Sequence, residues 1–319
     1  MSKPPATVID ADGLRAALPM ATTVTAIQHA LRDGLDPEAD PARSVVPVEH
    51  GQLLLMPSHS RRYAGVKIAT VAPGNPALGL PRIQGTYLLL DAETLSPLAV
   101  LDGVALTAIR TAAVSAAAAD LLAVAEPERL VVFGTGPQAH SHVEALRAIR
   151  PTLRHITVVG RDEDRLAAFL AQYGDAGPTV EAGAPDAVAR ADLVACCTTA
   201  RTPLFDGSTL PAHATVVAVG SHEPEAREVD DTTARRSTVV VEARGAALRE
   251  AGDVILAVRS GALDPDALVG LADLVRGTVK ADTSRPRLFK SVGMAWEDLV
   301  VAGVAYESRQ GQGSSLGGT

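Results

Sequence analysis

The chain has 319 residues, of which 47% are hydrophobic, 21% charged and 3% aromatic, and its formal net charge at pH 7 is −8. A chain of this length can bury a substantial core in one large or two ordinary domains. Its negative charge, without a basic cluster carrying interleaved aromatics, gives no electrostatic attraction to nucleic acid or anionic membranes. We therefore expect neither as a partner.

Three further features predict a cytoplasmic protein. The first segment, Met1–Gly13, lacks the apolar core of a signal peptide. Thr107–Ala125 is interrupted by two charged residues, and alanine is too weakly apolar for us to expect a membrane span there. Cys196 and Cys197 are adjacent and would point to opposite faces of a strand, so they cannot staple the fold, and two thiols alone make no zinc site. We expect no metal.

The first part of the chain, up to about residue 105, contains short β-like runs that predict an antiparallel or mixed sheet. These runs are GQLLLMP (51–57), VKIATVAP (66–73), RIQGTYLLLDAET (82–94) and SPLAVLDG (96–103). Thr107–Ala125 then consists of strong helix formers without glycine or proline, which predicts one long helix.

From Arg129 onward, strand-like and helix-like segments alternate, which predicts a parallel sheet covered by helices. The segments are RLVVFGTG (129–136), PQAHSHVEALRAI (137–149), HITVVGR (155–161), EDRLAAFLAQY (163–173), ADLVACCTT (191–199), TVVAVGS (215–221) and TVVVEAR (238–244). We expect RLFKSVGMAWEDLVVAGVAYE (287–307) to be a helix that packs back on the first part of the chain.

A glycine loop follows the first strand of this second part. Gly134, Gly136 and Ala139 have the spacing G-x-G-x-x-A between a strand and a helix. The first glycine permits the turn, the second lets the backbone approach a pyrophosphate, and the alanine keeps helix and strand close. Such a motif alone is often a plain turn, but this context predicts dinucleotide binding.

The end of the second strand reads VVGRDEDR, with Arg161 followed by Asp162. An arginine there suits the 2′-phosphate of NADP, whereas an acid suits the ribose of NAD. Arg161 therefore predicts a preference for NADP(H). NAD(H) remains possible if Arg161 is a solvated charge and Asp162 meets the ribose.

Three basic residues of the first part have apolar neighbours in sequence, namely Arg43, Lys67 and Arg110. Each alone is more often a solvated charge. Together they could form a clamp for a substrate carboxylate, since arginine binds carboxylates in a bidentate manner and lysine adds a point charge. Their spacing does not prove that they converge.

At this point the chain resembles the ornithine cyclodeaminase/mu-crystallin family over nearly its whole length. Five segments carry the resemblance in the family's order, namely RYAGVKIATVAPGNPALGLPRIQGTYLLLDAET (62–94), LDGVALTAIRTAA (101–113), VVFGTGPQA (131–139), VGSHEPEAREVDD (219–231) and LFKSVGMAWEDL (288–299). Five ordered matches are far more specific than the glycine loop alone.

The resemblance implies an α/β homodimer in which a Rossmann dinucleotide-binding domain is inserted into a smaller α+β substrate and dimerisation domain. Residues 1–112, completed by a C-terminal helix at 290–308, would form the substrate domain. Residues 113–289 would form the Rossmann domain, and we expect a disordered tail at 309–319.

The resemblance also implies residue roles. Arg43, Lys67 and Arg110 look like the family's substrate-carboxylate residues. In the NADP-using mu-crystallins an arginine stands in the place of Arg161, whereas NAD-using cyclodeaminases carry an aspartate near there. The expected cofactor contacts are Thr111, Gly134, Thr135, Gly136, Gln138, Ala139, Arg161, Thr198, Val219 and Ser291.

Three departures from the family's pattern bear on the substrate. True ornithine cyclodeaminases have a glutamate at the place of Leu54 and an aspartate at the place of His222, and both acids serve the distal amino group of ornithine. Leucine and histidine cannot attract a second ammonium group, which argues against ornithine. Arg82 stands where many members have a threonine, and we count it as a candidate substrate-binding residue.

The leading hypothesis is an NADP-dependent reductase of a cyclic or open α-imino acid, or the reverse oxidation of an L-amino acid. Reduction requires a protonated imine nitrogen, and either His222 or Lys67 could hold that proton as a catalytic residue. His222 could equally be a turn residue ahead of Pro224. The competing hypotheses are an NAD-dependent cyclodeaminase that releases ammonia and a non-catalytic NADPH-binding protein.

Overall fold

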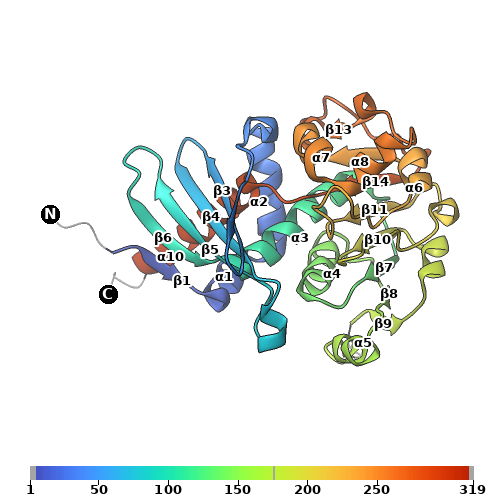
Figure 1. The fold of residues 1–319 in the computed structure, drawn as a ribbon, viewed down its shortest axis with the longest axis horizontal. Coiled ribbons are helices and arrows are strands. Elements are labelled where there is room, and N and C mark those ends of the chain that lie inside the picture. The colour runs from blue at the N-terminus through green and yellow to red at the C-terminus, as the bar shows by residue number, and fades with distance from the viewer. Residues whose placement is uncertain (1–4, 175–176, 316–319) are drawn as a thin grey trace. The chain divides into compact units, whose positions relative to one another are not determined.

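The computed structural model describes residues 5–174 and 177–315 (Figure 1). The chain divides into two compact units. Unit 1 comprises Met1–Arg110 and Met294–Thr319, and unit 2 comprises Thr111–Gly293. The second unit is thus inserted into the first.

Unit 1 is built on a six-stranded mixed sheet in the order β1-β6-β5-β4-β3-β2. The β1–β6 pair is parallel, and every other neighbouring pair is antiparallel. The β-like runs in the first part of the sequence therefore form strands, as expected. The strands are β1 (Thr7–Ile9), β2 (Ser44–Val48), β3 (Gly51–His59), β4 (Tyr63–Val71), β5 (Ile83–Asp91) and β6 (Pro97–Asp102).

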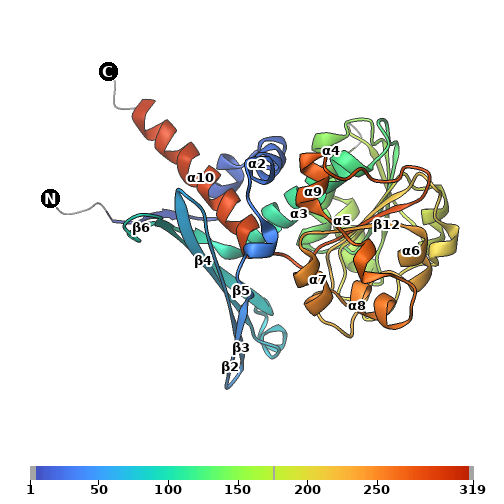
Figure 2. The ribbon, with the colours of Figure 1, turned by 90° about the horizontal axis from the view of Figure 1, so that it is seen from above.

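Helices pack against one face of this sheet (Figure 2). The C-terminal helix α10 contacts β3, β4 and β5 as well as α1 and α2. Side chains alternate along each strand, so every second residue of β4 and β5 points toward α10. The helical segments are α1 (Ala11–Ala17), α2 (Met20–Arg32), η1 (Pro37–Ala39), η2 (Asn75–Leu78) and α10 (Ala295–Ser315).

Helix α3 (Gly103–Leu122) is the long alanine-rich helix that the sequence predicts. Asp102 caps it, because its carboxylate accepts hydrogen bonds from the N–H groups of Val104 and Ala105 at 2.9 and 2.8 Å. By length and hydropathy α3 could cross a membrane, but 72% of its most apolar window is buried inside the protein. That burial is typical of a core helix.

Unit 2 is built on an eight-stranded parallel sheet in the order β13-β12-β14-β11-β10-β7-β8-β9. Six neighbouring strands of this sheet, in the spatial order β9-β8-β7-β10-β11-β14, follow the dinucleotide-binding order 3-2-1-4-5-6. The topological switch point lies between β7 and β10. The strands are β7 (Arg129–Phe133), β8 (His155–Val159), β9 (Thr179–Ala182), β10 (Leu193–Cys196), β11 (Thr215–Ala218), β12 (Thr238–Val241), β13 (Val269–Gly270) and β14 (Arg287–Lys290). This is the Rossmann architecture expected from the sequence.

The helices of unit 2 connect successive strands (Figure 1). They are α4 (Pro137–Ile149), α5 (Glu163–Leu170), η3 (Pro185–Arg190), η4 (Gly207–Thr209), α6 (Asp231–Arg236), α7 (Arg244–Glu250), α8 (Gly252–Arg259), η5 (Pro265–Ala267) and α9 (Leu271–Arg276). In such sheets ligands bind at the carboxyl ends of the strands, so the segments that follow β7, β8, β10 and β11 are the candidate cofactor edge.

The C-terminal region differs from the sequence-based expectation in two ways. Arg287–Lys290 is not helical but forms β14, which is buried between β11 and β12. A segment of four residues is too short for its periodicity to distinguish a strand from a helix. Helix α10 continues to Ser315, into the segment where we expected a tail. Each glycine costs a helix only about 1 kcal/mol, and neither of those in this segment ends it. Residues 316–319 lie outside the described part of the chain.

Candidate functional site

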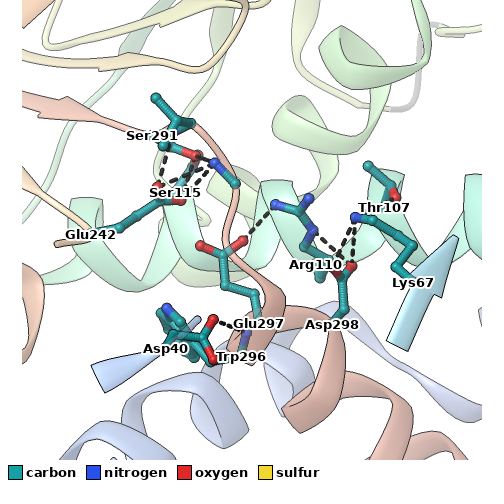
Figure 3. A network of polar contacts seen from close by, with 12 residues as sticks. Asp40, Lys67, Thr107, Arg110, Ser115, Glu242, Ser291, Trp296, Glu297 and Asp298 are labelled. Carbon is teal, nitrogen blue, oxygen red and sulfur yellow. Dashed lines mark hydrogen bonds and ion pairs between the residues drawn. The ribbon is translucent and has the colours of Figure 1, made fainter. Parts of the chain in front are cut away.

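Lys67 and Arg110 meet at one carboxylate inside unit 1 (Figure 3). The Nζ atom of Lys67 lies 3.1 and 2.8 Å from Oδ1 and Oδ2 of Asp298, and Nε of Arg110 lies 3.0 Å from Oδ1 of the same residue. We call Lys67 and Arg110 the cation pair. Both side chains are at most 5% exposed, and that of Asp298 is fully buried. The structure therefore brings together two of the residues predicted to bind a substrate carboxylate.

Lys67 enters this position because it lies on the face of β4 that α10 covers. Its register partners Met56 on β3 and Tyr87 on β5 are also buried. Burial and the nearby positive charge of Arg110 lower the pKa of Lys67 to about 8, against the opposing effect of Asp298. Lys67 is therefore mostly protonated at pH 7, yet far more acidic than an ordinary lysine.

Two more acids lie beside the cation pair. Oε2 of Glu297 forms an ion pair with Nη1 of Arg110 at 2.5 Å. Asp40 accepts hydrogen bonds from the Ser58 hydroxyl at 2.6 Å and the Trp296 N–H at 2.9 Å, and burial raises its pKa. From the sequence alone we expected no role for either acid. The only signal in the sequence is that Glu297 and Asp298 are adjacent acids within the apolar run MAWEDLVVAGV, and this signal does not include Asp40.

The remaining substrate-site candidates fall in different places. Arg43 directly precedes β2, whose first residue, Ser44, pairs with Leu55 on β3. Leu54 is buried on the same sheet face as Lys67. It lies on β3, two residues from Met56, which is the register partner of Lys67.

Arg82 is exposed and precedes β5. Tyr87 is the β5 partner of Lys67. Arg82 precedes Tyr87 by five residues, so it lies about 16 Å from Tyr87 along the strand direction. Within one copy of unit 1 the structure does not bring Arg82 to the cation pair. Its role in substrate binding stays a prediction.

The glycine loop of unit 2 has the geometry that its sequence predicts. Gly134 has a φ of 110°, and a Cβ there would lie 2.5 Å from the Cys197 carbonyl oxygen, so a side chain at this position would clash. Gly136 is the N-cap of α4, and Pro137 is the first residue of the helix. Ala139 is fully buried, which permits the close packing of helix and strand.

Three observations fit a dinucleotide at this loop. A Cβ at Gly136 would meet no atom within 4 Å, so the backbone there borders open space that a side chain would occupy. The N-terminus of the 13-residue α4 supplies N–H groups and a positive dipole at that place. Oε1 of Gln138 is buried without a hydrogen-bond partner among the described residues. Thr135 is half-buried in the loop, and Thr111 is buried on α3.

Arg161 and Asp162 follow β8 and have different local roles. Arg161 is exposed. Asp162 is the N-cap of α5, where its carboxylate accepts a hydrogen bond from the Arg165 N–H at 3.0 Å. The carboxylate is thus already engaged in capping its own helix. This arrangement favours Arg161 over Asp162 as the group that meets the ribose.

The other predicted cofactor residues lie at the carboxyl edge of the same sheet, after β10, β11 and β14. Thr198 donates from its N–H and hydroxyl groups to Oε1 of Glu228, at 2.8 and 2.7 Å. Val219 is half-buried, and its N–H continues the pairing by donating to the Cys196 carbonyl. Ser291 is buried and donates to Oε1 of Glu242 at 2.6 Å.

These contacts show that buried carboxylates shape the cofactor edge. Glu228 also accepts from the Gly220 N–H at 2.7 Å, and burial raises its pKa. Glu242 also accepts from the backbone N–H groups of Val292 and Gly293. The sequence reasoning missed both acids, because each reads as an ordinary loop charge until the strands are aligned.

His222 lies in the exposed turn after β11. Its neighbour Ser221 is buried, and the Ser221 carbonyl accepts a 2.6 Å hydrogen bond from Nζ of the fully buried Lys290. The buried Lys290 therefore holds this turn from the interior of unit 2, while the His222 imidazole is on the surface of unit 2. This geometry is compatible with both predicted roles of His222, proton donor and turn residue.

Comparisons with known proteins agree with this architecture. A Delta(1)-pyrroline-2-carboxylate/Delta(1)-piperideine-2-carboxylate reductase of Azospirillum brasilense is 38% identical over 95% of this chain and 96% of its own. The structure of Thermococcus litoralis Delta(1)-pyrroline-2-carboxylate reductase in complex with NADH and L-proline superposes with a TM-score of 0.89 at 29% identity, covering 96% of this chain and 98% of that one.

An archaeal alanine dehydrogenase dimer with bound NAD superposes with a TM-score of 0.89 at 25% identity, covering 97% of each chain. The family model of the ornithine cyclodeaminase/mu-crystallin family matches residues 11–313. The resemblance noted from the five sequence segments is thereby confirmed, and the chain belongs to the ornithine cyclodeaminase/mu-crystallin family.

Proposed function

We propose that the protein is an NADP-dependent reductase that converts a cyclic α-imino acid, such as pyrroline- or piperideine-2-carboxylate, into the corresponding L-amino acid, or catalyses the reverse reaction. The observation that carries this proposal is the buried cation pair, Lys67 and Arg110, with the apolar Leu54 on the same sheet face. The named activity of the Azospirillum relative and the bound L-proline of the Thermococcus structure support the same substrate class.

Each of these residues has a task in imine reduction. Arg110, together with Arg43, would bind the substrate carboxylate, since a guanidinium matches its two oxygens. Lys67 would donate a proton to the imine nitrogen, because its pKa of about 8 keeps it charged at neutral pH and makes it a better acid than a free lysine. His222 is the alternative donor.

The dinucleotide, when bound, supplies the hydride that reduces the imine carbon. One hydride and one proton are added across the C=N bond, which yields the secondary amine and the oxidised dinucleotide. Gly134, Gly136 and the N-terminus of α4 would hold the pyrophosphate. We propose NADP(H) as the preferred form, since Arg161 is exposed while Asp162 caps its helix. Because two structural neighbours contain NADH or NAD, NAD(H) is tested as well.

We further propose a homodimer. The sheet face of unit 1 opposite α10 is rich in apolar side chains, with Val46 42% and Ile68 41% exposed. The archaeal alanine dehydrogenase that superposes on this chain is a dimer. A second copy packing on this face would bury those side chains. A cytoplasmic location completes the proposal and is supported by the free thiols of Cys196 and Cys197.

The decisive experiment mixes purified protein with NADPH and either Δ1-piperideine-2-carboxylate or Δ1-pyrroline-2-carboxylate, and follows the nicotinamide absorbance. NADH is tested in parallel, and a third reaction with ornithine and NAD is assayed for ammonia. We expect NADPH consumption and no ammonia. Ammonia without NADPH consumption would assign the protein to the cyclodeaminases instead. NADPH binding without turnover of either imine would contradict the reductase proposal and favour a binding protein.

A further inference from the structure

Asp298 occupies the centre of the buried cluster in unit 1 (Figure 3). Its Oδ1 accepts from Nζ of Lys67 at 3.1 Å and from Nε of Arg110 at 3.0 Å, and its Oδ2 lies 2.8 Å from Nζ of Lys67. One carboxylate on α10 thus fixes side chains from β4 and α3. The neighbouring Glu297 forms its ion pair with Arg110.

The cation pair needs such a carboxylate for two physical reasons. Removing an ammonium and a guanidinium from water is costly, and the two like charges repel each other. A shared acid between them offsets both effects and fixes their orientation through charge-assisted hydrogen bonds. Without it, the less costly outcome would be loss of the proton from Lys67, since a guanidinium keeps its own.

Groups on α3, α10 and β5 contribute to this balance or face Lys67, whereas its β3 neighbour, Met56, is uncharged. The positive charge of Arg110 lowers the pKa of Lys67, and the negative charges of Asp298 and Glu297 raise it. Thr107 accepts a hydrogen bond from Nζ at 3.2 Å. Tyr87 lies opposite Lys67 on β5, and its phenol stays neutral because burial, Asp298 and Asp40 raise its pKa. Asp298 is the largest influence that keeps Lys67 protonated.

We propose that Asp298 is a positioning residue of the reaction, which holds Lys67 and Arg110 in one fixed arrangement and supplies the negative charge that a buried Lys67 needs to carry a proton. The inference rests on the proposed function, because it gives Asp298 a task in imine reduction. Asp298 acts through the cation pair and is not itself assigned a contact with the substrate.

The first test reads Lys67 directly and needs no turnover. The chain contains four lysines, so the ¹³Cε signals of labelled lysine form a spectrum simple enough to assign with Lys67→Met. In the wild-type protein the Lys67 signal should titrate with a midpoint of about 8. In Asp298→Asn the midpoint should fall by at least about one pH unit, the size expected when an opposite charge at this distance is removed.

The second test reads catalysis. In the reduction direction, kcat/KM should fall above pH 8 in the wild-type enzyme. In Asp298→Asn the pH at which kcat/KM falls should be lower, by the same amount as the NMR midpoint. KM for the imino acid should also rise, by about tenfold, because Arg110 loses one charge-assisted bond that orients it. The matched control is Glu307→Gln, which removes an acid on the same helix that pairs with Arg62 at the surface. Both readouts should be unchanged in it.

A purely structural Asp298 would lower the yield of folded enzyme but leave the NMR midpoint and the pH limb in place, and that result would overturn the inference. If Asp298→Asn does not fold, Asp298→Glu keeps the charge but lengthens the side chain. Its midpoint should stay near that of the wild type while KM rises, and an unchanged KM would overturn the positioning role. A wild-type enzyme inactive on both imines would refute the proposed function, whereas the NMR titration would still test the link between Asp298 and Lys67.

Discussion

Nζ of Lys290 lies 3.0 Å from Oδ2 of Asp253, and both side chains are completely buried in unit 2. The other oxygen of Asp253 accepts from the N–H groups of Glu228 and Val229, at 2.6 and 2.9 Å. Lys290 in turn donates to the Ser221 carbonyl. The ion pair and its hydrogen bonds thus join the end of β14 to the turn after β11 and to the bend at Glu228 and Val229.

This relationship predicts a large loss of stability in Lys290→Met. The substitution leaves the Asp253 carboxylate buried without its cation, which costs about 3–5 kcal/mol in the free energy of unfolding. Denaturant titration measures the change. The control Lys280→Met removes an exposed lysine and should stay within about 0.5 kcal/mol of the wild type. A loss below about 1 kcal/mol in Lys290→Met would show that the pair contributes little.

The preference for NADP(H) predicts a selective effect of Arg161→Ser. Loss of a guanidinium that pairs with a 2′-phosphate should weaken NADPH binding about tenfold to a hundredfold, whereas NADH binding should change less than about twofold. Isothermal titration with both nucleotides measures the two affinities. The control is Arg165→Ser, which removes a nearby exposed arginine on α5. Equal weakening of both nucleotides in Arg161→Ser would argue against a role for Arg161 in discrimination.

The architecture was predictable from sequence where local patterns are strong. The segment PQAHSHVEALRAI predicts a helix after a glycine loop, and α4 has the same bounds, Pro137–Ile149. The short segment Arg287–Lys290 was assigned to the wrong element, because four residues are too few for a sequence pattern to distinguish a helix from a buried strand.

The candidate site was predictable only in part, because its contacts join residues far apart in sequence. Lys67 and Arg110 stand out as charges in apolar runs, and the family resemblance gives them a role. Asp298 is 231 residues from Lys67, and nothing in the local sequence pairs the two. The partners of the buried acids emerge only when the strand register and the packing of α10 are known.

His142 predicts how stability responds to acid. It is fully buried on α4, where Nδ1 donates to the Gln138 carbonyl at 2.7 Å and Nε2 accepts from the Ser115 hydroxyl at 2.9 Å. Burial lowers its pKa to about 4. The unfolded chain therefore binds more protons than the folded one between about pH 6.5 and 4. Stability is full above this window and is lost as the pH falls through it, by about 3 kcal/mol from this residue.

The measurement compares the free energy of unfolding at several pH values in wild-type protein and His142→Gln. The variant should be less stable at pH 7 but should lose about 3 kcal/mol less on acidification, because it has no imidazole to charge. His155→Gln removes an exposed histidine and should follow the wild-type curve. Parallel curves for wild type and His142→Gln would contradict the assignment.

The proposed homodimer predicts that a charge on the open sheet face of unit 1 separates the subunits. Ile68 is 41% exposed on the face of β4 opposite Lys67, in register with Leu55 on β3. In a dimer that buries this face, Ile68→Glu would place an uncompensated carboxylate in an apolar interface, which costs several kcal/mol. Light scattering after size-exclusion chromatography should show the wild type as a dimer and Ile68→Glu as a folded monomer. Leu248→Glu, at a residue of unit 2 with 42% exposure, should remain dimeric. A dimeric Ile68→Glu with unchanged dissociation would place the subunit contact on another surface.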